Sequence, residues 1–330
     1  DRRTGVKAVW YEKNGAARNV LVVGEMETPK PKPGEVLVRL AASGVNPSDV
    51  KSRAGRPPIA DRIIPHSDGA GVIEAVGEGV AQSRLGERVW IWNGQWKRPF
   101  GTAAEFIALP ANQAVPLPDT IDFPVGACLG IPALTALRAI DLHGAVAGRT
   151  LLVTGAASAV GHYAVQIAKR RGARVIGTAS AARRDHALDA GADAVIDYRT
   201  ENVAARVQEL TDGRGADGIV DMDLSSTAAL LPHGVLAAHG KLVCYGSNLA
   251  AEIPVSFPAM LWNSLTLQVF VVYELPADVR RRIIGELTRM LAAGELRHTI
   301  GATFTLEETA AAHEAVESGD TPGNVVLSIG

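Results

Sequence analysis

The stretch LLVTGAASAVGHYAVQIAKRRG, residues 151–172, decides the fold. It reads as an apolar strand, a turn of small residues and a helix that Gly172 ends. The helix has apolar side chains at helical spacing on Val160, Ala164, Ile167 and Ala168. A helix that begins directly after a strand offers unpaired backbone N–H groups and its positive dipole end to a phosphate. The stretch therefore predicts the pyrophosphate-binding turn of a dinucleotide site, with an ordinary ligand-free turn as the alternative.

The turn departs from the usual glycine fingerprint at one position. Ser158 stands where the second glycine is expected, and serine is a good N-cap that still lets a ligand approach the backbone. Gly161 remains for close packing of the helix on the strand. The literal spelling G-x-G-x-x-G occurs instead at GRGADG, residues 213–218. Because that stretch follows a helical pattern and precedes a strand, we interpret it as a helix-to-strand loop.

The end of the next strand indicates which dinucleotide is bound. NAD-binding proteins usually place an Asp or Glu there, about 20 residues after the turn, whereas arginine suits the 2′-phosphate of NADP. The strand around residues 174–179 runs into SAARRDH, with no carboxylate before Asp185. Ser180, Arg183 and Arg184 supply a hydroxyl and two cations at that place. We therefore predict NADPH rather than NADH; the alternative is that the arginines only coat a helix start.

Pattern along the 330 residues predicts an α/β protein with a split domain organisation. From Val6 to Leu117, short β-like runs alternate with Gly and Pro, which is typical of an antiparallel-rich β domain. Strands then alternate with helices, which indicates a doubly wound parallel sheet. The strands expected in it span residues 151–154, 174–178, 194–197, 218–222, 241–245 and 265–272. We expect domain boundaries at 1–119, 120–275 and 276–330, with the last part returning to the first domain.

Composition narrows the class of protein. Thirty-three Lys plus Arg against thirty-five Asp plus Glu give a formal charge of −2, which argues against a nucleic-acid or anionic-membrane partner. Cys128 and Cys244 are too few for a disulfide framework or a multi-cysteine metal site. No apolar run reaches the length of a membrane span. We expect a cytoplasmic enzyme, and the sequence lacks the nucleophile and metalloprotease motifs that would indicate a hydrolase.

Five stretches in one order carry a family resemblance that covers almost the whole chain. They are SGVNPSDVKSRAG, GAGVIEAVGEGV, LGIPALTALRAI, VTGAASAVGHYAVQIAKRRGARVIGTA and GADAVIDYRTEN. Together they resemble the medium-chain dehydrogenase/reductase superfamily and, within it, the zinc-free quinone oxidoreductases similar to zeta-crystallin. The resemblance implies a GroES-like β-rich domain plus a Rossmann domain with a doubly wound parallel sheet.

Zinc-dependent members of this superfamily carry cysteine and histidine ligands at positions where this chain differs. Asn46, Ser67 and Ile131 stand at the three ligand positions, so no ligand is retained. His66 lies one place from a ligand position, and His66, Asp68 and Cys128 could together rebuild a site. A buried structural histidine is the interpretation we prefer, and we predict no metal.

The resemblance also implies roles for individual residues. It implies pyrophosphate binding by the turn, 2′-phosphate binding by Arg184 and an aromatic neighbour of the adenosine half at Tyr198. It places ribose and nicotinamide along Gly246 and Ser247. The carboxamide of the nicotinamide is expected at the backbone of Phe270 and Val272. The implied cofactor-binding residues are Thr135, Ser158, Ala159, Val160, Gly161, Ser180, Arg183, Arg184, Tyr198, Gly246, Ser247, Phe270, Val272 and Asn324, with Asn46 also placed near the nicotinamide ring.

Two positions bear on the substrate. Relatives commonly have a tyrosine where this chain has Lys51, which could meet an anionic substrate or a developing oxyanion, or could be a surface lysine. Trp96 lies in WIWNGQWKRPFG, a loop that relatives place over the substrate, and a flat aromatic wall suits a quinone or enone. Trp90 and Trp92, two residues apart, are as well explained by core packing. We predict Asn46 and Lys51 as catalytic residues.

These features predict an NADPH-dependent oxidoreductase that transfers hydride to a small-molecule electrophile, a quinone, without zinc. One alternative is an NADPH-dependent alkenal, enone or enoyl double-bond reductase. The other is a non-catalytic NADPH-binding protein, crystallin-like or RNA-binding, against which the balanced charge weighs. The run LTLQVFVVYEL, residues 265–275, reads as a long apolar edge strand. Relatives pair that strand with its twin, so the resemblance implies a homodimer.

Overall fold

The computed structural model describes residues 5–330 and divides the chain into two compact units. Unit 1 comprises the chain up to Ile131 together with Thr288–Gly330, and unit 2 is Pro132–Leu287. The units divide after Ile131 and after Leu287, in each case later in the chain than the boundaries expected from sequence at 119/120 and 275/276. Helix α3 (Phe123–Gly126) packs on the strands of unit 1, and most of helix α10 (Ala277–Ala292) belongs to unit 2.

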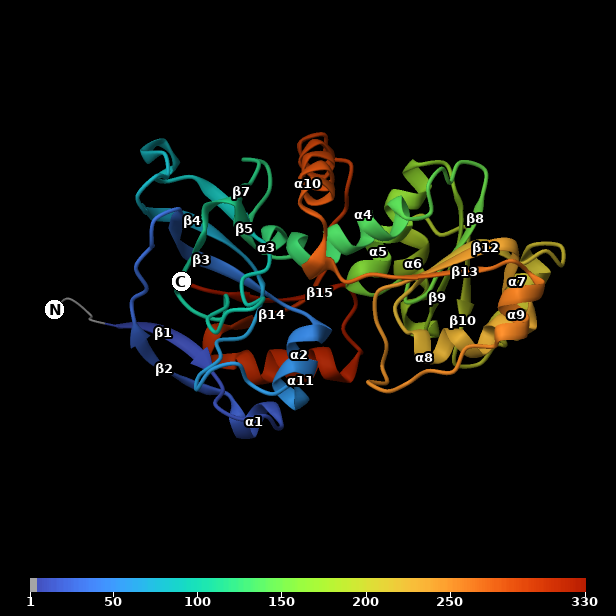
Figure 1. Cartoon of the computed structure of the whole chain (residues 1–330), viewed down its shortest axis with the longest axis horizontal. Helices are drawn as coiled ribbons and strands as arrows, with labels where there is room; N and C mark the ends of the chain where they lie inside the picture. The colour runs from blue at the N-terminus through green and yellow to red at the C-terminus, as the bar shows by residue number, and fades with distance from the viewer. Residues whose placement is uncertain (1–4) are drawn as a thin grey trace. The chain divides into compact units, whose positions relative to one another are not determined.

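Unit 1 is built on a seven-stranded sheet in which the end of the chain rejoins the beginning. The order is β14-β15-β3-β4-β5-β7, with β6 also paired to β3. Strand β15 runs antiparallel to β3, and Figure 1 shows the two side by side although they come from opposite ends of the chain. The end of the chain therefore pairs with a strand of the first part. The strands are β3 (Glu35–Val45), β4 (Asp68–Val76), β5 (Arg88–Ile91), β6 (Phe106–Pro110), β7 (Ala114–Pro116), β14 (Ile300–Thr305) and β15 (Asn324–Ser328).

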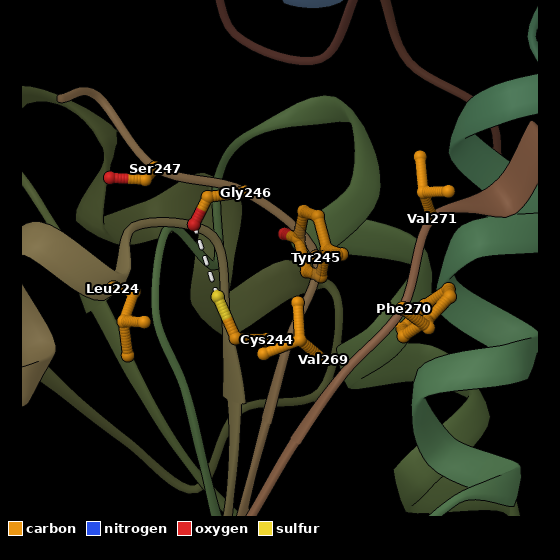
Figure 2. A pocket seen from close by; sticks show the side chains of 8 residues that line it. All are labelled: Leu224, Cys244, Tyr245, Gly246, Ser247, Val269, Phe270 and Val271. Carbon is orange, nitrogen blue, oxygen red and sulfur yellow. Dashed lines mark hydrogen bonds between the residues drawn. The ribbon is translucent and has the colours of Figure 1, made fainter. Parts of the chain in front are cut away.

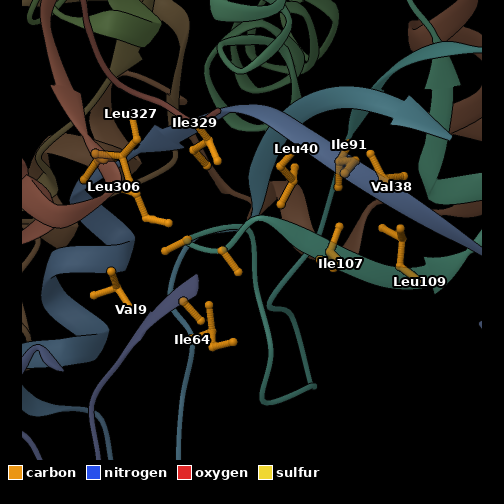
Figure 3. Close-up of a cluster of buried hydrophobic side chains, with 14 of the residues drawn as sticks. Val9, Val38, Leu40, Ile64, Ile91, Ile107, Leu109, Leu306, Leu327 and Ile329 are labelled. Atoms are coloured by element: carbon orange, nitrogen blue, oxygen red, sulfur yellow. The ribbon is translucent and has the colours of Figure 1, made fainter. Parts of the chain in front are cut away.

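Buried apolar side chains on these strands form the core of unit 1. On β3, Val36, Val38 and Leu40 are buried, and they join apolar side chains from β5, β6 and β15 in one cluster (Figure 3). Two strands that the sequence pattern did not predict, β2 (Val22–Glu27) and β7, are present. Strand β2 pairs with β1 (Gly5–Trp10) as a separate ribbon. The helices here are α1 (Ala17–Val20), α2 (Pro47–Gly55), α3 and α11 (Thr309–Ser318).

Unit 2 is a six-stranded, all-parallel sheet in the order β10-β9-β8-β11-β12-β13. Numbered along the chain this is 3-2-1-4-5-6, the doubly wound order that places a crevice between the first and fourth strands. The predicted doubly wound parallel sheet is confirmed. The strands are β8 (Thr150–Val153), β9 (Arg174–Ala179), β10 (Ala194–Asp197), β11 (Ala216–Asp221), β12 (Leu236–Cys244) and β13 (Thr266–Val269).

Helices of unit 2 follow the strands as expected, with one difference in burial. Ser158 is the N-cap of helix α5 (Ala159–Arg170), and residues 161–168 are buried without interruption rather than along a stripe. The helix packs both on strands β8 and β9 and on α4, which explains the wider burial. GRGADG forms the end of the loop after α7 and the first three residues of β11, so it leads from a helix into a strand, as predicted. The other helices are α4 (Leu134–Asp141), α6 (Arg184–Asp189), α7 (Val203–Leu210), α8 (Leu224–Thr227) and α9 (Phe257–Trp262).

The edge strand of unit 2 is shorter than its apolar run predicts. We expected a strand over 265–272, but β13 ends at Val269 and a 3-10 turn follows at Val272–Glu274. The Phe270 N–H still donates to Cys244 O at 3.1 Å, after which the chain leaves the sheet. Arg280 donates to Val272 O at 2.6 Å and holds the turn. A run of apolar residues in the sequence does not predict the contact between Arg280 and Val272 O.

No helix within residues 5–330 is long and apolar enough to cross a membrane. The longest, α10, has 16 residues and carries several charges.

Candidate functional site

The turn between β8 and α5 has the geometry that a pyrophosphate needs. Ser158 caps the helix: its Oγ accepts the Gly161 N–H at 3.3 Å and donates to Gly155 O at 2.6 Å. Gly155 has φ of +62°, which favours glycine. A Cβ on Gly161 would lie 1.9 Å from Gly155 O, so only glycine fits there. The first N–H groups of the helix have no intrahelical acceptor, and such groups can donate to an anion.

Cationic side chains follow β9, as the sequence predicts. Arg184 is exposed and Arg183 half-buried, while Ser180 is almost fully buried. One Arg184 nitrogen donates to Val195 O at 2.8 Å, which ties the side chain to β10. Tyr198, at the end of β10, is exposed with Arg199 stacked 5.7 Å from its ring centroid. Two arginines, a hydroxyl and an aromatic face therefore lie at the carboxyl ends of β9 and β10.

A pocket of about 430 Å³ opens at the carboxyl ends of β12 and β13 (Figure 2). It brings together three predicted cofactor residues, Gly246, Ser247 and Phe270. Cys244 lies in its wall, and its thiol donates to Gly246 O at 3.0 Å. Sequence reasoning missed the other lining residues, although four of them lie within two residues of the predicted ones along the chain and only Leu224, on α8, comes from elsewhere. They are Leu224, Cys244, Tyr245, Val269 and Val271.

Two further predicted cofactor residues, Thr135 and Val272, differ in the hydrogen-bonding groups that they offer to a ligand. The Thr135 hydroxyl on α4 is buried, and no hydrogen-bond partner lies within the described residues 5–330. An orphaned buried hydroxyl costs free energy, so it fits a ligand that completes its bonding. Val272 differs, because its carbonyl already accepts from Arg280. Of its two backbone groups, the N–H is therefore the one that suits a carboxamide.

A buried carboxyl at the crevice was not predicted. Asp221, at the end of β11, accepts Thr154 Oγ1 at 2.9 Å and Thr227 Oγ1 at 2.7 Å. Thr154 follows β8, so the contact joins the first and fourth strands of the sheet at the switch point. Burial raises the pKa of Asp221 above its ordinary value. Its neighbour Asp223 accepts both the backbone and side-chain amides of Asn248, at 2.8 and 3.0 Å, and so fixes the loop after β12.

In unit 1, the predicted catalytic Asn46 lies between two buried carboxyls. Its side-chain amide donates to Asp68 Oδ2 at 2.8 Å, and its backbone N–H donates to Asp49 Oδ2 at 2.8 Å. Asn46 is the N-cap of α2 and is 4% exposed. Burial raises the pKa of Asp49 to about 7 and that of Asp68 well above its usual range. Asp68 was weighed only as a metal ligand, and the spacing of 22 residues gave no signal of this contact.

Three other predicted site residues, Lys51, Trp96 and Asn324, lie in unit 1. Lys51 lies exposed on α2, one turn beyond the cap. Trp96 is half-buried in the loop after β5, whereas Trp90 is fully buried within the strand, as core packing predicts. Asn324 is buried at the start of β15, and its amide donates to Thr299 O at 2.9 Å. Roles for Lys51, Trp96 and Asn324 stay predictions.

The three side chains that could rebuild a metal site are each bound elsewhere. The ring nitrogens of His66 contact Ser43 and His313, the Asp68 carboxyl holds Asn46, and the Cys128 thiol donates to Pro124 O at 3.4 Å. Across residues 5–330, His, Cys, Asp and Glu form no group of three that could hold a metal ion. These side chains do not fit a zinc centre.

A 3-2-1-4-5-6 sheet with a glycine-bearing turn at its crevice is the dinucleotide-binding arrangement of NAD(P)-dependent oxidoreductases. Residues 32–119 match the alcohol dehydrogenase GroES-like domain, and residues 159–289 match the zinc-binding dehydrogenase family. With the relatives described next, these matches show that the chain belongs to the quinone oxidoreductase family of medium-chain dehydrogenases/reductases. The GroES-like and Rossmann domains implied by the sequence are confirmed.

Relatives match over nearly the full chain. The quinone oxidoreductase of Rattus norvegicus is 31% identical over 98% of this chain and 97% of its own. That of Pseudomonas aeruginosa is 33% identical over 93% and 95%, and the 2-haloacrylate reductase of a Burkholderia species is 31% identical over 98% of each. A mycobacterial protein solved with NADPH has a TM-score of 0.87 at 28% identity, covering 98% of this chain and 99% of its own. An NAD-dependent alcohol dehydrogenase has a TM-score of 0.88 at 29% identity, covering 98% and 100%.

Proposed function

We propose that this protein is an NADPH-dependent reductase that transfers hydride to quinones without a bound zinc ion. The observation that carries the cofactor assignment is the end of β9, where two arginines and Ser180 precede the first carboxylate, Asp185. Arginine suits a 2′-phosphate, whereas a carboxylate would suit a free ribose hydroxyl. NADPH, when bound, supplies a hydride from C4 of its nicotinamide.

Unit 2 residues bind and orient the cofactor. The N–H groups of Ala159 and Val160, in the first turn of α5, would donate to the pyrophosphate. Arg183 and Arg184 would hold the 2′-phosphate, Gly246 and Ser247 would hold the ribose and nicotinamide, and the orphaned Thr135 hydroxyl would bind the nicotinamide half. Fixing the dinucleotide at both ends orients the reacting carbon, which is where binding contributes to rate.

Unit 1 residues act on the acceptor. One N–H of the Asn46 amide is held by Asp68, and we assign its second N–H to the acceptor oxygen, where negative charge develops. A quinone is already electron-poor, so one or two such donors are enough. Exposed Lys51 is a second donor and Trp96 a flat wall for the ring. Solvent delivers the proton.

The absence of zinc from this proposal is supported by the donor set. Asn46, Ser67 and Ile131 stand where zinc-dependent relatives have their ligands. His66 and Asp68, which could replace them, already have hydrogen-bond partners within unit 1. Acceptor polarisation is therefore assigned to hydrogen-bond donors rather than to a Lewis acid.

A double-bond reductase is the second candidate. The observation that favours it is the 2-haloacrylate reductase, which matches this chain over its full length. A conjugated alkene would accept the hydride at carbon, and the same donors would stabilise the charge that develops on its carbonyl oxygen.

We also propose a cytoplasmic homodimer. Strand β13 is at the edge of its sheet, which exposes a row of backbone N–H and C=O groups. Apolar side chains gather on β13 and the nearby α9: Trp262 is 82% exposed and Val269 63%. Pairing of β13 with its twin would cover both the backbone edge and these side chains.

The test is NADPH and NADH oxidation at 340 nm, each with 1,4-benzoquinone, 9,10-phenanthrenequinone and a 2-alkenal. Rapid oxidation of NADPH with the quinones supports the proposal. Preference for NADH contradicts the 2′-phosphate assignment. Turnover of the alkenal alone favours the double-bond reductase, and tight NADPH binding without turnover indicates a binding protein.

Metal dependence is measured in the same assay. Dialysis against a zinc chelator should leave quinone turnover unchanged. Loss of turnover that zinc restores contradicts the zinc-free mechanism.

A further inference from the structure

A chain of hydrogen bonds crosses the interior of unit 1 from a buried guanidinium to the main chain beside Asn46. Its members come from α2, α11, β3, the start of β4 and the loops before β4 and β6, and the two histidines are 247 residues apart in sequence. The five links are Arg53 Nη1 to His313 Nδ1 at 2.9 Å, His313 Nε2 to His66 Nε2 at 2.8 Å, His66 Nδ1 to Ser43 Oγ at 3.0 Å, Ser43 Oγ to Thr102 Oγ1 at 2.8 Å and Thr102 Oγ1 to Asp68 O at 2.6 Å.

The two ends of this chain fix the direction of every link. Arginine only donates, so His313 Nδ1 must accept, and its proton is then on Nε2. His66 Nε2 accepts the hydrogen bond from His313 Nε2–H, and His66 Nδ1–H donates to Ser43 Oγ. The serine then donates to Thr102, which donates to a carbonyl that can only accept. The two histidines are therefore neutral and in opposite tautomers.

Burial makes each link hard to replace. Ser43, His66, Thr102 and His313 are 0% exposed and Arg53 is 2% exposed, so water cannot substitute for a lost partner. A buried donor or acceptor left alone costs more than the bond itself contributes. The arginine charge is met by Glu317, 2.6 Å away. Because arginine does not release its proton, the chain orients groups and cannot serve as a proton path from the surface.

His66 adopts a backbone conformation that a histidine seldom has. Its φ is +80°, in the left-handed region that favours glycine. Such strain persists only where surrounding contacts hold it, and it clusters at functional sites. The ring contacts of His66 to Ser43 and His313 hold it here, together with the Thr102 N–H, which donates to the His66 carbonyl at 2.9 Å.

The chain ends on the residue that orients Asn46. Asp68 is held at its carbonyl by Thr102, and its side-chain oxygen Oδ2 accepts a hydrogen bond from the Asn46 amide. Asp68 also faces Gly44 in the β3–β4 ladder, next to Ser43. A shift of Asp68 would therefore turn the Asn46 amide.

We propose that Ser43, His66 and His313 are positioning residues, which act through Asp68 to hold the Asn46 amide in its donating orientation. This inference rests on the proposed role of Asn46 in acceptor binding. It adds three residues that the sequence pattern did not place in the site.

The test is a double-mutant cycle on quinone turnover. Ser43→Ala removes one link and should lower kcat about tenfold with the KM for NADPH unchanged, because small displacements of positioned groups lose large factors in rate. In an Asn46→Ala background, Ser43→Ala should have no further effect. An equal loss in both backgrounds overturns the proposal, because a merely structural defect does not depend on Asn46.

Thr211→Val is the matched control. Thr211 is a buried hydroxyl in unit 2 that donates to Val207 O at 2.7 Å and accepts from Gly215 N at 2.9 Å. Its loss should lower Tm and leave kcat unchanged. A control that lowers kcat as much as Ser43→Ala does also overturns the proposal.

A second readout needs no turnover. In protein with 15N-labelled asparagine and histidine, the ring protons should lie on Nδ1 of His66 and Nε2 of His313. Ser43→Ala should shift the Asn46 side-chain amide signal, which Asn46→Ala identifies, and Thr211→Val should not. An unmoved signal overturns the positioning role. If that signal moves while Asn46→Ala leaves turnover unchanged, the positioning of the Asn46 amide by Ser43 is supported and the proposed catalytic role of Asn46 is contradicted.

Discussion

His66 and His313 join their Nε2 atoms at 2.8 Å inside unit 1, with their rings stacked 5.0 Å apart. Such a contact requires that at least one ring be neutral, and the links beyond them require that both be. Burial lowers the pKa of His313 to about 3, with the Arg53 charge as a second cause. Burial, and then His313, lowers that of His66 well below its ordinary value.

This pair should make unit 1 sensitive to acid. The unfolded chain takes up protons on these histidines near pH 6.5, before the folded protein does. Their contribution to stability is therefore complete above pH 6.5 and is lost as pH falls, by about 1.4 kcal/mol per pH unit for each histidine. Urea unfolding followed by tryptophan fluorescence reports mainly on unit 1, which holds Trp10, Trp90, Trp92 and Trp96.

His313→Asn should weaken this dependence between pH 6.5 and 5. The variant is less stable at every pH, because Arg53 loses an acceptor, but its stability should fall less steeply with acid. Thr211→Val, which removes no ionisable group, should give a curve parallel to that of the wild type. Parallel curves for His313→Asn would contradict the prediction.

Asp49 should show the opposite dependence. Burial raises its pKa to about 7, so the folded protein keeps a proton that the unfolded chain has lost. Stability from this group is present at low pH and is lost as pH rises toward 7. Asp49→Asn keeps the shape and the acceptor for the Asn46 N–H, and it should gain on the wild type by about 1.4 kcal/mol per pH unit between pH 5 and 7. The same difference in unfolding free energy between variant and wild type at pH 5 and at pH 8 would refute this. Because both proteins contain the two histidines, their contributions cancel in that difference.

Arg183→Ala and Arg184→Ala should each raise the KM for NADPH by about tenfold or more and leave that for NADH unchanged, since charge-assisted bonds contribute 1.5–3 kcal/mol. Arg149→Ala is the matched control. It removes the same charge from an exposed position at the amino end of β8, opposite the turn. Equal losses for both dinucleotides would show that the arginines support the fold rather than the 2′-phosphate.

The glycine of the turn offers a sharper test of geometry. Gly161→Ala would place a Cβ 1.9 Å from Gly155 O, a backbone atom, so the turn must move. NADPH binding measured by calorimetry should be lost and Tm lowered. Gly285→Ala, on α10 with nothing within 4 Å of the new Cβ, should keep NADPH affinity and stabilise by roughly 0.5–1 kcal/mol. Normal NADPH affinity in Gly161→Ala would contradict the assignment of this turn.

What the sequence could predict follows the range of the interactions involved. The β8–turn–α5 unit is local: its strand, cap and glycine lie within 22 residues, so periodicity and capping rules reach it. The Asn46–Asp68 contact and the His66–His313 contact depend on strand pairing and on the return of α11, which no local pattern encodes. The end of β13 was missed for the same reason. Arg280 caps the turn from the next helix, while the apolar run continues past Val269.

The exposed apolar side chains on α9 and β13 give the last prediction. Trp262→Glu places a charge where a twin subunit would bury an indole that is 82% exposed in one chain. Burying an unpaired charge costs several kcal/mol, which weakens dimer association by orders of magnitude, so light scattering should show a monomer of about half the wild-type mass. Ile59→Glu, at a residue 62% exposed in unit 1, is the control and should leave the wild-type mass unchanged. A monomeric wild-type protein would contradict the proposed dimer. A Trp262→Glu variant that stays dimeric would show that the interface lies elsewhere. If the dimer dissociates while quinone turnover per subunit persists, then each subunit holds a complete site, and pairing of β13 serves to cover its edge.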